Sequence, residues 1–261
     1  MILRGLAKNL KEQNWTAIWI EFILLVSGVF LGIQVANWNE DRLDRKREQD
    51  FLERLLIDIE NDQSALERRL NYIRESIAYG EDALTWVEDG TLVESSEWRT
   101  VMAFYNASRI LPYTPLDTTY QEMRSSGQLG LLRDPKLRSA LGLYFVISGA
   151  VRSDFIVKLN PEYRSHVRGL TPFRIARYIS SECFNILTTK HLACNSPIDD
   201  VSADVILQRY KTAPELTDEL AYWIDSAHLM IEILGKQRDD NVKLQQRIHV
   251  RLGRTPNKDT P

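Results

Sequence analysis

The sequence is poor in the residues and patterns that build β-structure. It has 12 glycines and 9 prolines in 261 residues, and they cluster between long segments of helical apolar spacing. Runs in which Val, Ile, Thr or aromatic residues alternate with polar ones are missing, so strands have little to form from. These shortages predict an all-α fold. The apolar and helical patterns described below specify it as an N-terminal transmembrane helix that continues into an elongated antiparallel helical bundle.

A strong charge imbalance is also absent. Lys and Arg number 33 against 36 Asp and Glu, for a formal net charge of -3. The basic surface that a nucleic-acid partner requires is therefore not expected. The apolar share of 44% and the charged share of 26% are those of a folded chain.

Motifs of catalysis and cofactor binding do not assemble either. The glycines at 127 and 130 read as a helix end and a turn, because neither a Lys-Ser/Thr pair nor a Rossmann context follows. Asp225 and His228, and likewise Glu162 and His166, have the spacing of metal ligands on one helix face, but further ligands are not evident. Surface pairs explain both, and we expect no cofactor, no metal and no catalytic constellation.

Two cysteines, Cys183 and Cys194, lie eleven positions apart in a segment of loop character. In an oxidising compartment they would close a disulfide loop that contributes about 2–3 kcal/mol. Unpaired thiols are the alternative. Zinc held by these cysteines and His191 is a third reading, although no fourth ligand is nearby and the spacing matches no standard pattern.

The longest apolar run spans residues 15–38. As a helix it would be about 36 Å long, enough to cross a hydrocarbon core of about 30 Å with some tilt. Trp15, Trp19 and Trp38 lie near its ends, where indole rings favour the membrane interface. A cleaved signal peptide is disfavoured because Gln34 occupies the minus-three position of the candidate cleavage site at Ala36. The run therefore predicts a membrane-spanning helix.

The charges that flank the expected membrane helix give a weaker indication of its orientation in the membrane. Residues 1–14 form a short basic tail with three Lys or Arg, whereas residues 42–47 contain four. The count of cations alone does not decide, but net charge favours the N-terminal side inside. We therefore expect the N-terminus on the inner side of the membrane and the C-terminal domain on the exported side, where a disulfide would also persist.

Beyond the span, residues 39–252 predict a helical soluble domain. A long helix over 39–88 carries apolar residues in a 4-3 spacing from Leu52 to Val87, the coiled-coil type of seam, interrupted at Gln63 and Gly80. Shorter helices are expected within 96–158, with a capping box at Thr118–Gln121. Residues 161–202 are expected to be irregular, with short helices and the cysteine loop. A long helix over 214–252 completes the domain, and 253–261 form a disordered tail.

One face of the expected membrane helix combines small residues with an acid. At about 100° per residue, Glu21, Gly28 and Gly32 fall on one side, with Ala36 flanking them. Two glycines four positions apart let another helix approach closely, and a carboxylate in a membrane is costly unless it is paired. These four residues predict a helix–helix contact; a lipid-facing Glu21 near the headgroups is the simpler alternative.

Two segments carry a resemblance to a known family. Residues 28–40 read GVFLGIQVANWNE, and residues 118–141 read TTYQEMRSSGQLGLLRDPKLRSAL. In order and spacing both segments resemble a family of uncharacterised bacterial single-pass inner-membrane proteins. The resemblance implies a bacterial single-pass inner-membrane protein, whose exported C-terminal domain would lie in the periplasm. It implies no enzymatic activity.

From these features the sequence predicts a membrane-anchored interaction or sensor-like module. Its partners would be the lipid bilayer and either a second copy of the chain or another membrane protein, met through the transmembrane helix. An accessory subunit of a larger inner-membrane complex is the alternative, and an enzyme is the third possibility. Side chains at Tyr120, Arg124, Ser125 and Ser126 could face a groove near Gly127, although capping and packing explain them equally well.

Overall fold

The computed structural model describes residues 15–149, 161–183 and 194–254. In these ranges every regular element is helical, as the composition predicts. The expected tails at 1–14 and 255–261, and His191 of the zinc reading, lie outside the described residues.

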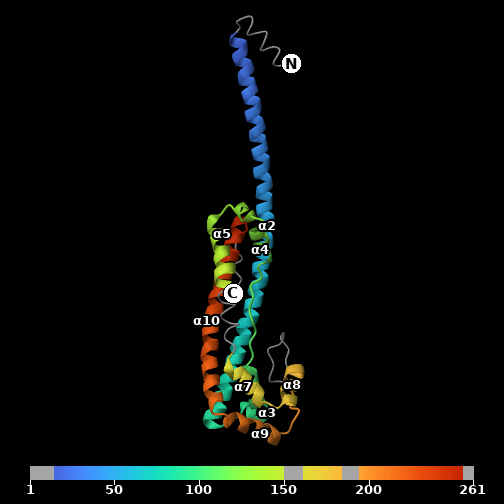
Figure 1. Ribbon diagram of the computed structural model, residues 1–261, viewed down its shortest axis with the longest axis vertical. Coiled ribbons are helices and arrows are strands. Elements are labelled where there is room, and N and C mark those ends of the chain that lie inside the picture. Colours follow the sequence, from blue (N-terminus) through green and yellow to red (C-terminus); the bar gives the residue numbers. More distant parts are fainter. Residues whose placement is uncertain (1–14, 150–160, 184–193, 255–261) are drawn as a thin grey trace.

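A single helix, α2 (Trp15–Asp89), organises the molecule. Its first half stands alone, and its second half runs down one side of a helical bundle (Figure 1). The first buried residue of α2 is Glu48, and Gly90 ends the helix in a left-handed conformation at φ 79°. No break separates the apolar segment from the bundle, so the two parts form one continuous element.

The last helix, α10 (Pro214–Arg251), returns along α2 in the opposite direction (Figure 1). Asn241 donates a hydrogen bond to the carbonyl of Ile59 at 2.9 Å, and Arg254 pairs with Glu53 at 2.8 Å. The helices approach each other closely at Gly80, where an added Cβ would lie 2.1 Å from Cδ1 of Ile224. The interruption of the apolar spacing at Gly80 is therefore a point of close helix contact.

Shorter elements close the bundle at both ends (Figure 1). Near the exit of α2 they are α4 (Thr118–Ser125), the 3₁₀ turn η2 (Gln128–Leu131), α5 (Pro135–Gly142) and the π-helical segment η3 (Leu143–Gly149). At the far end they are the 3₁₀ turn η1 (Val93–Ser95), α3 (Glu97–Ala107), α7 (Glu162–Leu170), α8 (Phe173–Glu182) and α9 (Asp200–Lys211).

Residues 161–202, expected to be irregular with short helices and the cysteine loop, contain in their described part α7, α8 and the first residues of α9. Pro161 and Pro172 occupy the N-cap positions of α7 and α8, where the missing N–H of proline costs nothing. Each helix buries an apolar pair, such as Tyr163 and Val167 in α7. Both helices thus have the amphipathic spacing by which a short helix buries one face.

One of the expected helix caps is formed differently. At Thr118–Gln121 the capping box is absent: the Gln121 amide donates to the Asp117 carboxylate at 2.8 Å, and the Thr119 N–H donates to Asp58 on α2 at 2.7 Å. By contrast, Ser96 accepts from the Arg99 N–H and Asp134 accepts from the Lys136 N–H, as their sequence patterns predict.

Two hydrophobic clusters fill the bundle. The cluster nearer the exit of α2 includes Leu55 and Ile59 of α2, Leu141 of α5 and Ile248 of α10. The larger cluster at the far end gathers residues of α2, α3, α7, α8, α9 and the first half of α10. Between them, α2 and α10 contribute buried polar side chains, so the core has a polar layer near its middle.

Candidate functional site

The free part of α2 exposes its apolar side chains on all sides. Over residues 15–47 no described side chain is buried, and Trp15, Trp19 and Trp38 are each more than half exposed. By length and composition this segment is the one candidate membrane span among the described helices. It has no packing partner within the described chain.

The four residues of the expected contact face lie in this free segment. A Cβ placed on Gly28 or Gly32 would meet nothing within 4 Å, and Ala36 is exposed. Glu21 is half-buried, and its Oε2 has no hydrogen-bond partner among the described residues. The face is therefore open along Gly28, Gly32 and Ala36, and its one acid retains an unused acceptor atom.

An ionic cluster fixes the point at which α2 enters the bundle. The Glu48 carboxylate is buried and accepts hydrogen bonds from the backbone N–H of Arg133 at 2.9 Å and from the Arg251 guanidinium at 3.3 Å. The Arg133 side chain also reaches Asp41 at 3.3 Å, about two turns further toward the free segment. These contacts join α2, the segment between η2 and α5, and the end of α10, and they fix the direction in which α2 leaves the bundle.

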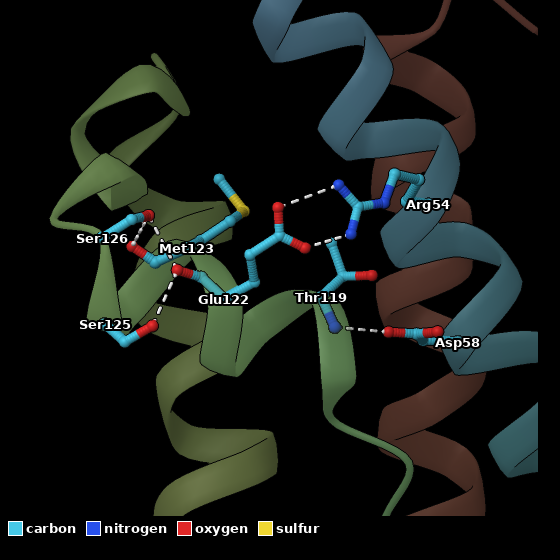
Figure 2. A network of polar contacts seen from close by, with 7 residues as sticks. All are labelled: Arg54, Asp58, Thr119, Glu122, Met123, Ser125 and Ser126. Atoms are coloured by element: carbon cyan, nitrogen blue, oxygen red, sulfur yellow. Dashed lines mark hydrogen bonds and ion pairs between the residues drawn. The ribbon is translucent and has the colours of Figure 1, made fainter.

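A second set of contacts attaches α4 to α2 (Figure 2). The Arg54 guanidinium donates to the Glu122 carboxylate through Nη1, at 3.1 Å, and through Nη2. Asp58 accepts a hydrogen bond from the Thr119 N–H. Ser125 and Ser126 donate to the Glu122 carbonyl, so their hydroxyls terminate the helix locally. The expected groove near Gly127 is not built by these serines.

The polar layer inside the bundle centres on Asp62 of α2. Its carboxylate is fully buried and accepts hydrogen bonds from the Tyr113 hydroxyl at 2.8 Å, from the Tyr144 hydroxyl, and from the Leu116 N–H at 3.3 Å. Burial raises the pKa of Asp62, and the hydrogen bonds from the two tyrosines offset part of that shift. Burial likewise raises the pKa of both tyrosine hydroxyls. All three groups thus remain hydrogen-bonded in a water-poor interior.

The same layer extends to α10 through amide side chains. Asn241 donates to the Tyr144 hydroxyl at 2.8 Å and accepts from the Gln245 amide at 2.8 Å, and that amide also contacts Gln63. Such a network is stable only when its members are satisfied together. It therefore specifies how α2, η3 and α10 are aligned.

The structure gives His166 different neighbours from those considered in the sequence. Its Nδ1 lies 2.8 Å from Glu219 of α10, and Glu215 lies close enough for one ligand atom from each residue to fall within 4.8 Å. His166 and Glu215 are exposed and Glu219 is half-buried, and a histidine–carboxylate pair accounts for the geometry. His228 similarly approaches Glu81 of α2, at 3.9 Å, across the helix interface.

The two cysteines lie side by side at the far end of the bundle. Their sulfurs are joined, and their Cα atoms are 5.2 Å apart. Cys183 follows α8, and the carbonyl of Cys194 accepts a hydrogen bond from the Trp98 indole at 3.1 Å. The cystine therefore attaches the segment after α8 to α3.

Comparison with known proteins places one part of the chain in context. Residues 21–147 match the model of a family of unknown function (DUF6090). No curated protein and no solved structure matches the chain. The matched range contains most of the free segment, the rest of α2, and Asp62, Tyr113 and Tyr144 of the polar layer.

Proposed function

We propose that this chain is a single-pass protein of the bacterial inner membrane that serves as an interaction or sensor-like module. One observation carries the proposal: α2 continues unbroken from Trp15 to Asp89, and buried packing begins only at Glu48. The same helix would then cross the membrane and form the core of the bundle. An event at the bundle would reach the membrane through a rigid connection.

The exposure of the free segment supports a lipid environment. Side chains such as Phe22, Leu24 and Phe30 are more than half exposed, and leaving many such side chains in water costs about 1.5–3 kcal/mol each. At about 36 Å, residues 15–38 suffice to span the hydrocarbon core. A lipid bilayer would bury these side chains without a second protein.

Assembly would use the face of Glu21, Gly28, Gly32 and Ala36. A second helix can approach two glycines closely, which increases van der Waals contact in a lipid medium. A carboxylate at Glu21 would gain a partner on the opposing helix. The open space around both glycines supports this role.

A location of the bundle in the periplasm agrees with the cystine. Disulfides persist in oxidising compartments and are rare in the cytosol. A bond between Cys183 and Cys194 would thus be maintained on the exported side. A reporter fused after Pro261 tests this orientation, and cytoplasmic activity of that reporter would contradict it.

An accessory subunit of a larger membrane complex is the second candidate. It is favoured by Glu21, whose Oε2 has no hydrogen-bond partner and could meet a basic group on a different protein. In this case the chain would co-purify with a defined partner. A self-sufficient module would instead be recovered alone or as a homo-oligomer.

Native mass spectrometry of the full chain, released in mild detergent, separates these possibilities. Gly28→Ile adds bulk on the proposed face, whereas Phe30→Ile changes the opposite face and serves as the control. We expect Gly28→Ile to lower the share of homo-oligomer or complex several-fold and Phe30→Ile to leave it unchanged. Equal shares in both variants would contradict assembly through this face.

A further inference from the structure

A hollow of about 530 Å³ lies between α5 and α10. Small-molecule sites are typically about 300–1,000 Å³. Its interior is formed mainly by apolar side chains, among them Ala140, Leu143 and Leu244. Leu143 is 53% exposed although it adjoins the core, so its side chain is available to a ligand. The hollow has the size and lining of a binding site for a small apolar group.

The rim of the hollow is positively charged. Lys136 of α5 and Lys243 and Arg247 of α10 line it, with Asp240 as an acid. Asp240 contacts Lys243 at 3.2 Å. Within the described part of the chain, Lys136 and Arg247 form no ion pair. Two exposed cations therefore stand beside an apolar interior, an arrangement that complements a molecule with an apolar tail and an anionic head.

The backbone at this hollow departs from regular α-helix. α5 passes into the π-helical segment η3 at Leu143, and Tyr144, the next residue, also lines the hollow. π-helical turns are rare and occur frequently at functional sites. Here the change of helix type coincides with a residue, Tyr144, that contacts both the hollow and the polar layer.

We propose that this hollow binds a single-chain amphiphilic anion, with its alkyl tail against Leu143 and Leu244 and its carboxylate or phosphate head beside Lys136 and Arg247. The idea that this anion is the ligand of a sensor-like module rests on the proposed function, whereas binding of the anion to the hollow does not. Tyr144 connects the hollow to α2 because its hydroxyl hydrogen-bonds Asp62. Occupancy would therefore act on the helix that leaves the bundle.

The test uses the full chain in phosphatidylcholine nanodiscs and a decanoate probe that carries a photoreactive diazirine in its tail. After illumination, we expect adducts in the peptides that contain Leu143 or Leu244. Undecanoate or decyl phosphate should compete, and because their alkyl tails are equal in length, the stronger competitor identifies the preferred head group. Acetate, inorganic phosphate and decyltrimethylammonium should not compete, because each lacks either the tail or the negative charge.

Charge reversal provides the matched variants. Lys136→Glu with Arg247→Glu should lower labelling of these peptides by about tenfold, equivalent to about 1.4 kcal/mol. Arg174→Glu with Arg177→Glu, on the exposed side of α8, makes the same change of charge elsewhere and should have no effect. All four positions are exposed, and an unchanged thermal unfolding midpoint checks the fold. Undiminished labelling in the first pair would overturn the proposal.

Two further outcomes separate this site from the proposed assembly. Labelling confined to residues 15–38 would show partition of the probe into the bilayer alone and would overturn the site. In Gly28→Ile we expect unchanged labelling of the hollow even if the oligomer is lost. Labelling that appears only in this variant would mean that a second copy covers the hollow, which would also overturn the assignment.

Discussion

The hydroxyl of Tyr144 donates a hydrogen bond to the carboxylate of Asp62. Tyr144 belongs to η3 and lines the α5–α10 hollow, whereas Asp62 belongs to the helix that leaves the bundle. One buried contact therefore connects the candidate ligand site with the candidate membrane span. The stability of this contact can be measured directly.

Tyr144→Phe should destabilise the bundle. It removes the hydroxyl that binds both Asp62 and Asn241, so each of these buried groups loses one of its hydrogen bonds, for a total cost of about 1–3 kcal/mol. Tyr222→Phe is the matched control because Tyr222 is 70% exposed, and we expect a change within about 0.5 kcal/mol. Urea unfolding followed by tryptophan fluorescence measures both. Equal effects would contradict a structural role for the layer.

The pKa of Asp62 predicts a specific pH dependence. Burial raises this pKa in the folded protein, so between the ordinary and the raised value the folded chain holds a proton that the unfolded chain has released. Within this window, rising pH therefore lowers the stability that Asp62 contributes. Asp62→Asn removes the titration, and contributions from other carboxylates cancel in the comparison.

The measured quantity is the unfolding free energy of the wild type minus that of Asp62→Asn, from about pH 4 upward. We expect the difference to fall as the pH rises and then to level off above the raised pKa. A difference that stays constant or increases with pH would show that the carboxylate is already ionised in the fold.

Two glycines should respond to alanine with opposite signs. At Gly80 the new methyl group would collide with Ile224, so Gly80→Ala should destabilise by about 1–2 kcal/mol despite the better helix propensity of alanine. At Gly235, inside α10, nothing lies within 4 Å, and alanine should stabilise by up to about 1 kcal/mol. Thermal unfolding of both variants tests this, and stabilisation in both would argue against close packing at Gly80.

Removal of the cystine should weaken the far end of the bundle. Replacing Cys183 and Cys194 by serine is expected to lower the unfolding free energy by about 2–3 kcal/mol, from the lost constraint on an 11-residue separation. Maleimide labelling of the denatured wild type should require prior reduction. Labelling without reductant would indicate free thiols and would weaken the periplasmic assignment.

Local chemistry explains what the sequence could predict. Leu52, Leu66 and Leu70 repeat at helical spacing, and each is buried as that spacing implies. Ser96 and the Asp134–Pro135 pair mark helix starts through contacts within three residues. Such features need no knowledge of the rest of the fold.

Contacts between distant segments explain what the sequence could not predict. Thr118 has the pattern of a capping box, but Asp58, from another helix, takes the neighbouring backbone donor. Asp62 lies 51 and 82 residues from its two tyrosine partners, and its position reads only as one polar residue on a helix. The hollow likewise depends on two helices about a hundred residues apart. Sequence spacing alone does not encode these distances.

The unbroken course of α2 also determines a phase relationship. Each residue between Ala36 and Glu48 turns the helix by about 100° and advances it by about 1.5 Å. Two residues inserted there would turn the bundle by roughly 200° relative to the Gly28 face, whereas seven would nearly restore the original azimuth. The length of this short connection therefore sets which side of the bundle faces a neighbour in the membrane.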